Sequence, residues 1–245
     1  MTPSSRSGKP RSKKRLAWVA GVVGLACCAL LLPCTWKVRE SEGWTRSAYS
    51  LKNIGEALRG YQSVYGRLPP AVITGKDGKP LYSWRVELLP FLEQDHLYNQ
   101  IRKDEPWDSL HNKPLLEKTP RCYRPLLGGY DNPGLTHYQV FVGPGTAFEG
   151  VGHTPNDFID PASTILVAEG AVPVPWAKPV DLIYATDQPL PLLGGLYSQP
   201  VHFVCFEIYR KTGFNACFAD GTTRYLSSST DERTIRAHIV YKIGE

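Results

Sequence analysis

The strongest structural signal in the sequence lies in residues 44–65, WTRSAYSLKNIGEALRGYQSVY. Its apolar side chains recur at steps of three and four, at Trp44, Ala48, Leu51, Ile54, Leu58, Tyr61 and Tyr65. This spacing places them on one face of an α-helix, as in a helix that packs against a core. Lys52 and Glu56 add an i,i+4 ion pair, and Gly66 and Pro69 end the pattern. The stretch therefore predicts a long amphipathic helix.

The residues before this helix predict a membrane anchor. Residues 1–15 hold six bases and no acid, and residues 16–36 follow without a charged side chain. A helix of this length rises about 30 Å, the thickness of a hydrocarbon core. The bases place the N-terminus in the cytoplasm by the positive-inside rule. We expect a basic tail over residues 1–15, a single-pass span from Leu16 to Trp36, and an extracytoplasmic body over residues 37–245.

Two other interpretations of the apolar segment stay open: a cleaved secretory signal peptide and a buried core helix. No small-x-small cleavage site follows the run, because its exit reads Leu31-Leu32-Pro33-Cys34. A core helix would not normally follow six bases directly. The anchor is the interpretation that both observations favour.

The charge of the chain argues against a nucleic-acid partner. The 245 residues include 28 bases and 23 acids, a formal net charge of +5. Without the six bases of the tail, 22 bases oppose the same 23 acids. The body therefore has no electrostatic footprint for a phosphate backbone. Its 42% of hydrophobic residues indicate a core, while 22 glycines and 21 prolines predict many turns and irregular loops.

Several short elements are expected after the first helix. Ser83 is placed to cap a helix over residues 84–89, and residues 91–101 predict another helical stretch. Ser229 and Glu232 have the spacing of a capping box that opens a terminal helix with Ile235, Ile239 and Val240 facing inward. Short strands are expected over residues 138–142 and 164–168, and a proline-rich loop is expected over residues 173–200.

The clearest strand signal is a late hairpin. Two alternating runs, residues 214–219 and 222–226, flank Asp220 and Gly221. Asp-Gly between such runs predicts a two-residue loop in a type I′ turn. Asp220 is then a residue of the fold, and the alternative is that it binds a cation or a partner.

No catalytic constellation is recognisable in the sequence. The six histidines show neither helical i,i+4 spacing nor a His-Glu-x-x-His pattern, and they lie at His96, His111, His137, His153, His202 and His238. Gly-x-Ser-x-Gly and phosphate-binding glycine motifs are absent. Ser109 and His111 are interpreted as turn residues. We predict no catalytic residue, no cofactor and no metal ligand, and we expect a protein that is not an enzyme.

The cysteines leave the disulfide pairing open. Three lie in the apolar segment, and the other three lie in the body at Cys122, Cys205 and Cys217. An odd number in a compartment that permits disulfides allows one pair and one free thiol, and spacing does not say which pair. No Cys-x-x-Cys occurs, so the pattern does not favour zinc.

Two sets of residues are candidates for ligand binding. Loop oxygens from several acids can converge on a hard cation, here Asp157, Asp160 and Glu169. Aromatic residues can line a sugar or peptide groove, here Trp84, Trp107 and Trp176. The alternatives are solvated loop acids in the first set and the packing of a loop-rich domain in the second.

A series of ordered stretches carries a family resemblance. They are residues 51–58 with Tyr61 and residues 68–70, then 83–94, 106–109, 111–112, 121–122, 143–146, 163–169, 174–179 and 213–221. In this order they resemble a bacterial family of exported proteins, domain of unknown function 1559, which also carries a solute-binding label. The resemblance implies a type IV pilin-like plan over about residues 47–245.

Some positions depart from the family pattern. The bases run directly into Leu16, without the Gly-Phe junction and the Glu of a prepilin leader. Ser47 stands where members often place a cysteine, the usual partner of Cys122, and Arg210 stands where many carry a histidine. The resemblance therefore implies architecture and does not extend to prepilin processing, fibre assembly or an activity.

The sequence as a whole predicts an α+β protein. We expect an N-terminal transmembrane helix and then a pilin-like domain, in which the amphipathic helix packs on a small antiparallel sheet with large irregular loops. The expected function is that of a non-enzymatic, membrane-anchored protein of the bacterial cell envelope, located in the cytoplasmic membrane and contacting protein partners outside it. The alternative is a tethered binding module for a carbohydrate, peptide or cation.

Overall fold

The computed structural model describes residues 43–124, 133–150, 152–194, 201–203, 206–208 and 213–241. They belong to one compact unit, Gly43–Glu245. The predicted tail and transmembrane span lie outside the described residues. Among the residues that were described, no helix has the length and apolar character needed to cross a bilayer.

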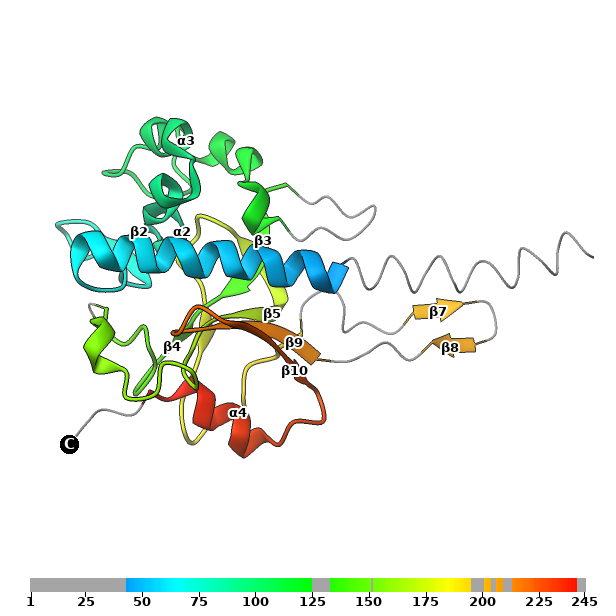
Figure 1. Cartoon of the computed structure of the whole chain (residues 1–245). Helices are drawn as coiled ribbons and strands as arrows, with labels where there is room; N and C mark the ends of the chain where they lie inside the picture. Colours follow the sequence, from blue (N-terminus) through cyan, green and yellow to red (C-terminus); the bar gives the residue numbers. More distant parts are fainter. Residues whose placement is uncertain are drawn as a thin grey trace, which may run out of the picture. The chain divides into compact units, whose positions relative to one another are not determined.

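The predicted amphipathic helix is confirmed and covers residues 43–65 (α1, Figure 1). Leu51, Ile54 and Leu58 are completely buried, as their spacing requires. The ion pair of Lys52 and Glu56 forms on the exposed side, with 3.9 Å between Nζ and Oε1. The inward orientation predicted for Tyr65 is wrong, because its side chain is 57% exposed at the end of the helix.

A four-stranded antiparallel sheet lies between α1 and the C-terminal helix α4 (Figure 1). Its strand order is β10-β9-β5-β3. The bounds are Leu135–Gln139 for β3, Ile165–Pro175 for β5, Gly213–Phe218 for β9, Thr223–Ser227 for β10 and Glu232–Ile239 for α4. The long helix on an antiparallel sheet confirms the expected α+β class.

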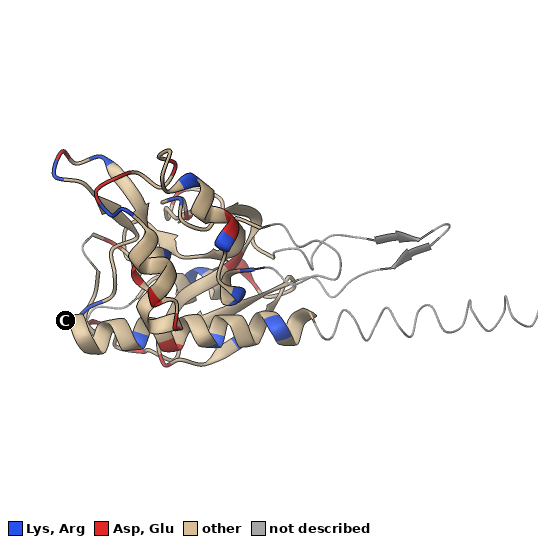
Figure 2. Cartoon of the chain, turned by 90° about the horizontal axis from the view of Figure 1, so that it is seen from above, with Lys and Arg blue, Asp and Glu red and all other residues tan. Residues whose placement is uncertain are grey.

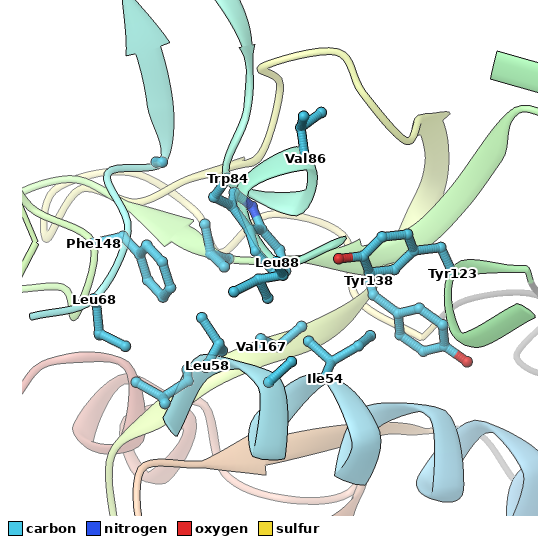
Figure 3. Packing of buried hydrophobic residues seen from close by; sticks show 14 of the residues in the cluster. Ile54, Leu58, Leu68, Trp84, Val86, Leu88, Tyr123, Tyr138, Phe148 and Val167 are labelled. Atoms are coloured by element: carbon cyan, nitrogen blue, oxygen red, sulfur yellow. The ribbon is translucent and has the colours of Figure 1, made fainter. Parts of the chain in front are cut away.

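Alternation along β9 divides the core into two layers. Phe214, Ala216 and Phe218 pack with Ile235 and Ile239 of α4. The intervening Cys217 belongs to the layer under α1, where Ile54, Leu58 and Val167 meet Trp84 and Phe148 (Figure 3). Because successive strand residues face opposite sides, one buried strand serves both layers. The sheet is therefore covered on both faces.

The strand bounds differ from those predicted. The run expected over residues 138–142 is divided, because β3 ends at Gln139 and Phe141–Val142 forms β4, which pairs in parallel with β6, Leu182–Ile183. The strand expected to end at Ala168 continues as β5 to Pro175. Pro173 fits because the register with β3 shifts between Thr136 and Tyr138, so the ladder is interrupted opposite residues 170–173, and Pro175 is the last residue of the strand.

The remaining elements are short. Ser83 caps α2 as predicted, but α2 spans only Trp84–Glu87, and the stretch after it forms two helices separated by Glu93 at φ 58°. These are η1, Leu89–Leu92, and α3, Asp95–Gln100. The others are β1 Val72–Thr74, β2 Pro80–Ser83, η2 Lys113–Lys118, η3 Arg121–Tyr123, η4 Pro155–Asp157, β7 Val201–Phe203 and β8 Phe206–Ile208.

The late hairpin is confirmed, but the predicted type I′ turn is wrong. Among the described residues only Glu93 combines a side chain with a positive φ, so Asp220 does not have the φ that this turn requires. Gly221 alone is left-handed, at φ 84°, and its N–H donates to the carbonyl of Phe218. Phe218 N–H in turn donates to the carbonyl of Thr222, which makes a three-residue loop with a glycine bulge.

The predicted capping box of the terminal helix is also wrong. The N-cap of α4 is Asp231, without a side-chain cap bond, and Ser229 instead contacts Ser227. Glu232 pairs with Arg236 one turn later, at 2.7 Å. The predicted inward residues Ile235 and Ile239 are buried, whereas Val240 lies after the helix end and is half-buried.

Candidate functional site

A group of aromatic side chains surrounds one carboxylate at the end of α1. We call it the tyrosine cluster, and it consists of Tyr61, Tyr65, Tyr82, Phe91 and Tyr98 around Glu87. Five elements supply these residues: α1, β2, α2, η1 and α3. Residues from distant segments therefore meet at one partly exposed place.

The outer part of the cluster is a triangle of rings. The ring centroids are 4.4 Å apart for Tyr61 and Tyr65, 5.7 Å for Tyr61 and Phe91, and 6.4 Å for Tyr65 and Phe91. Gly60 makes this approach possible, because a Cβ at that position would lie 2.9 Å from the Phe91 ring. Contacts at these distances hold aromatic rings in defined orientations. The triangle is thus a formed surface.

Glu87 is half-buried, and its charge acts on Tyr61 of this triangle as well as on Tyr82 and Tyr98. Its Oε1 accepts a hydrogen bond of 3.0 Å from the hydroxyl of Tyr82. Burial and then the negative charge of Glu87 raise the pKa of Tyr61, Tyr82 and Tyr98, in the last case to about 12. Within the described part of the chain, no Lys, Arg or His nitrogen lies within 4.0 Å of this carboxylate.

Such an arrangement can attract a cation. The faces of aromatic rings carry partial negative charge, and a carboxylate among them adds a full one. A ring of the cluster already contacts an ammonium group, since Lys103 Nζ lies 3.8 Å from the centroid of Tyr98. The site also has aromatic surface on which an uncharged ligand can stack.

The three tryptophans considered as candidates to line a groove are placed in different surroundings. Trp84 and Trp176 are completely buried in the core under α1. Their indole N–H groups donate to Asp181 Oδ1 and to the carbonyl of Leu116. Trp107 is half-buried, with Lys178 Nζ 5.6 Å from its ring centroid. The packing alternative is confirmed for Trp84 and Trp176.

The three acids considered as a candidate cation site are not brought together. Asp157 forms a capping box with Thr154 at η4, Asp160 is exposed and bonds to Ser163, and Glu169 is buried on β5. Across the described ranges, no group of three His, Cys, Asp or Glu side chains is placed to hold a metal ion.

Glu169 instead belongs to a buried polar group between α1 and the sheet. The Ser47 hydroxyl donates to its Oε1, and the backbone N–H of Asn215 donates to its Oε2 at 2.7 Å. The hydroxyl of Tyr138 donates to Ser47 Oγ at 3.1 Å. These hydrogen bonds lower the pKa of Glu169, but burial has the larger effect and raises it to about 7. Ser47 stands where family members often have a cysteine, and here its hydroxyl forms a hydrogen bond with a buried carboxyl group.

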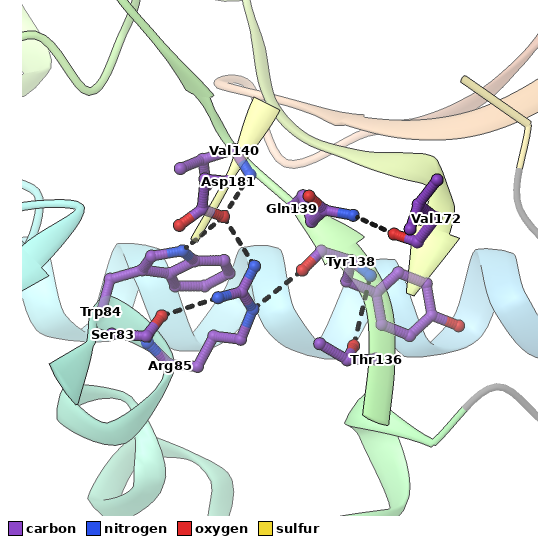
Figure 4. Close-up of polar contacts among 9 residues, drawn as sticks. All are labelled: Ser83, Trp84, Arg85, Thr136, Tyr138, Gln139, Val140, Val172 and Asp181. Atoms are coloured by element: carbon purple, nitrogen blue, oxygen red, sulfur yellow. Dashed lines mark hydrogen bonds and ion pairs between the residues drawn. The ribbon is translucent and has the colours of Figure 1, made fainter. Parts of the chain in front are cut away.

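A second buried group is an ion pair beside β3 (Figure 4). Arg85 Nη2 lies 2.6 Å from Asp181 Oδ1, and both side chains are excluded from solvent. Arg85 also donates to the carbonyl of Tyr138 and to Ser83 Oγ, while Val140 N–H donates to Asp181. These contacts connect α2, β3 and the segment before β6, so the pair belongs to the fold.

Ser109, His111 and the described cysteines do not form a reactive group either. His111 Nε2 contacts the carbonyl of Gln100, while Ser109 Oγ accepts from Asn112 N–H, so the two do not form a nucleophile and base. Cys122 and Cys217 are free thiols, and burial raises the pKa of each to about 12. Cys205, Arg210 and the side chain of His202 lie outside the described residues.

The sequence contained a weak signal for the tyrosine cluster. Tyr61 and Tyr65 are one helical turn apart, a spacing that we interpreted as core packing. The signal for Glu87 was weaker still, because no local pattern says that a carboxylate in a four-residue helix faces the end of another helix. The grouping depends on how α1 crosses the segment 82–98.

The comparisons with known proteins identify one family. Its model, described as "Protein of unknown function (DUF1559)", matches residues 46–146, which include every residue of the tyrosine cluster, Ser47 and Arg85. The match confirms the family resemblance for the stretches up to residue 146, whereas the resembling stretches at residues 163–169, 174–179 and 213–221 lie outside the matched residues. No curated protein and no solved structure matches the chain.

Proposed function

We propose that this protein, which belongs to the DUF1559 family through residues 46–146, is a membrane-anchored envelope protein whose pilin-like domain binds other proteins. The observation that carries the proposal is the short connection between the predicted span and the domain. The predicted span ends at Trp36 and the described helix begins at residue 43, which leaves six residues between them. Six residues reach about 20 Å at most, so the domain would work close to the bilayer surface.

The chemistry of the described residues supports a non-enzymatic role. Cys217 is buried and Cys122 is half-buried, and both have raised pKa values, which disfavours the reactive thiolate. Ser109 and His111 are bonded to other groups. α1 carries three basic residues and one acidic residue, Arg46, Lys52, Arg59 and Glu56, so this helix presents charged groups for contacts with protein partners (Figure 2).

Protease treatment of spheroplasts tests the anchor and its orientation. The full chain with a tag at each end should stay in the membrane fraction, and external protease should remove the C-terminal tag and keep the N-terminal one. Leu25→Arg, at the centre of the predicted span, should reduce membrane integration because a central Arg costs about 3 kcal/mol. Thr35→Arg, near the interface, is the matched control. A soluble full-length chain, or a body protected from external protease, would overturn the proposal.

The tyrosine cluster favours a second candidate function, a tethered binding module. Its rings and its carboxylate lie at a partly exposed place, as residues of a recognition site do. The two functions are compatible, because a tethered module recognises its ligand through such a site.

A further inference from the structure

We infer that the tyrosine cluster around Glu87 is a recognition site for a lysine or arginine side chain of a polypeptide partner. The inference rests on the proposed role in protein binding and specifies the site and the chemistry of the partner. It depends on two observations: the charge of Glu87 and the exposed ring of Tyr65 in its triangle with Tyr61 and Phe91.

The charge of Glu87 is the first observation. The carboxylate is half-buried and has one hydrogen bond, from Tyr82, and no ion pair among the described residues. A partly desolvated anion without a counter-ion is stabilised by an arriving cation more than an exposed carboxylate is. Two bases interact with rings of the cluster: the charge of Arg67 opposes the rise in the pKa of Tyr61, and Lys103 Nζ lies over Tyr98.

The ring faces are the second observation. Tyr65 is 57% exposed and contacts both Tyr61 and Phe91, so the triangle presents aromatic surface to solvent. A cation over such a face is attracted by the negative charge of the ring face, and the attraction is stronger where water is excluded. The contact of Lys103 with Tyr98 is an example of the same interaction within the chain.

The nature of the occupant follows from these two. A divalent metal ion needs several oxygen ligands, and the cluster has a single carboxylate. A neutral sugar would stack on the rings and leave the charge of Glu87 without a partner. Lysine and arginine carry a cation on an apolar stem, which can lie along Tyr65 and Phe91 while the head reaches the carboxylate. A basic polypeptide segment therefore matches both the aromatic surface and the negative charge of the site.

The test measures binding of an octalysine peptide to the full chain in detergent micelles, with octaglutamate as the negative peptide. Octalysine should bind and octaglutamate should not. Glu87→Gln should weaken octalysine binding about tenfold, since it removes the charge and keeps an oxygen for the Tyr82 hydroxyl. Tyr65→Ala should weaken binding about three- to fivefold through the lost ring contact.

The matched control is Glu117→Gln, which removes the same charge from an exposed position on η2 and should change binding less than twofold. Equal losses in Glu87→Gln and Glu117→Gln would show general charge attraction and overturn the inference. No octalysine binding, or binding of an uncharged N-acetylglucosamine oligomer that needs Tyr65 and not Glu87, would also overturn it. If Glu87→Gln shifts the urea midpoint of unfolding, its weaker binding reflects a folding defect. The inference is then decided by octalysine binding to Tyr65→Ala, because Tyr65 is exposed.

The two proposals fail separately. If octalysine does not bind, the protease pattern of spheroplasts is unaffected, and the proposal of an anchored envelope protein holds without this site. A body protected from external protease would overturn the envelope role while octalysine still bound the purified chain.

Discussion

Glu169 is a carboxyl group that the fold keeps away from water. Its side chain is 2% exposed, and burial raises its pKa from 4.5 to about 7 in spite of the hydrogen bonds from Asn215 and Ser47. The folded state therefore holds this proton at pH values where the unfolded chain has released it. A carboxyl group of this kind stabilises the fold fully below about pH 4.5, and its contribution is lost as the pH rises through about 7.

We predict that the stability of the full chain falls between pH 5 and pH 8 by up to about 3 kcal/mol on account of Glu169. Glu169→Gln should remove most of this decrease, because the amide does not titrate. Urea unfolding in detergent at the two pH values measures it, and Glu117→Gln should retain the wild-type decrease. An unchanged pH dependence in Glu169→Gln would contradict the assignment.

At the scale of elements, the contact between α1 and β9 depends on a glycine. A Cβ at Gly55 would lie 2.4 Å from Cys217 Sγ, well inside van der Waals contact. Alanine in a helix is ordinarily more stable than glycine by about 1 kcal/mol. Overpacking in a core costs about 1–3 kcal/mol, so the clash should decide the sign here.

We predict that Gly55→Ala destabilises the protein by about 1–2 kcal/mol. In a Cys217→Ala background, where the sulfur is absent, the same change should be neutral or stabilising. A double-mutant cycle from urea unfolding gives the coupling between the two positions. If Gly55→Ala had the same effect in both backgrounds, the close approach of helix and strand would be wrong.

At the scale of the molecule, the buried pair of Arg85 and Asp181 joins segments that are 96 residues apart. Its hydrogen bonds reach Tyr138 and Val140 in the sheet region and Trp84 in α2. Removing one member of a buried pair leaves the other charge without compensation, which costs about 3–5 kcal/mol. The arrangement of the segment around residues 82–98 over the sheet therefore depends on this pair.

We predict that Arg85→Met lowers the free energy of unfolding by about 3–5 kcal/mol. Adding Asp181→Asn should restore a large part of it, since the amide oxygen can still accept from Trp84 Nε1 and Val140 N–H without carrying a charge. Urea unfolding of the single and double variants measures this. A double variant as unstable as Arg85→Met alone would show that packing of the Arg85 side chain, and not the unpaired charge, is responsible.

The part that the sequence determined by itself consists of local patterns. Residues 44–65 repeat apolar side chains with the helical period over six turns, and Asp220-Gly221 separates two alternating runs, so α1 and the late hairpin were predicted correctly. Ser83 was identified as a cap because a cap is a contact between neighbours in the chain. The family blocks were recognisable for the same reason, as ordered short stretches.

Tertiary structure alone decided which of these local features meet. The turn at Asp220 took a three-residue form because its pairing continues to Phe218 and Thr222, which the dipeptide does not specify. Trp84 is buried in the core, whereas Tyr65 lies on the surface against Phe91. Glu87 became a candidate recognition residue because packing of α1 brings tyrosines from other segments around it. Periodicity assigns a side chain to a face, but the distance between two faces follows from packing of the whole core.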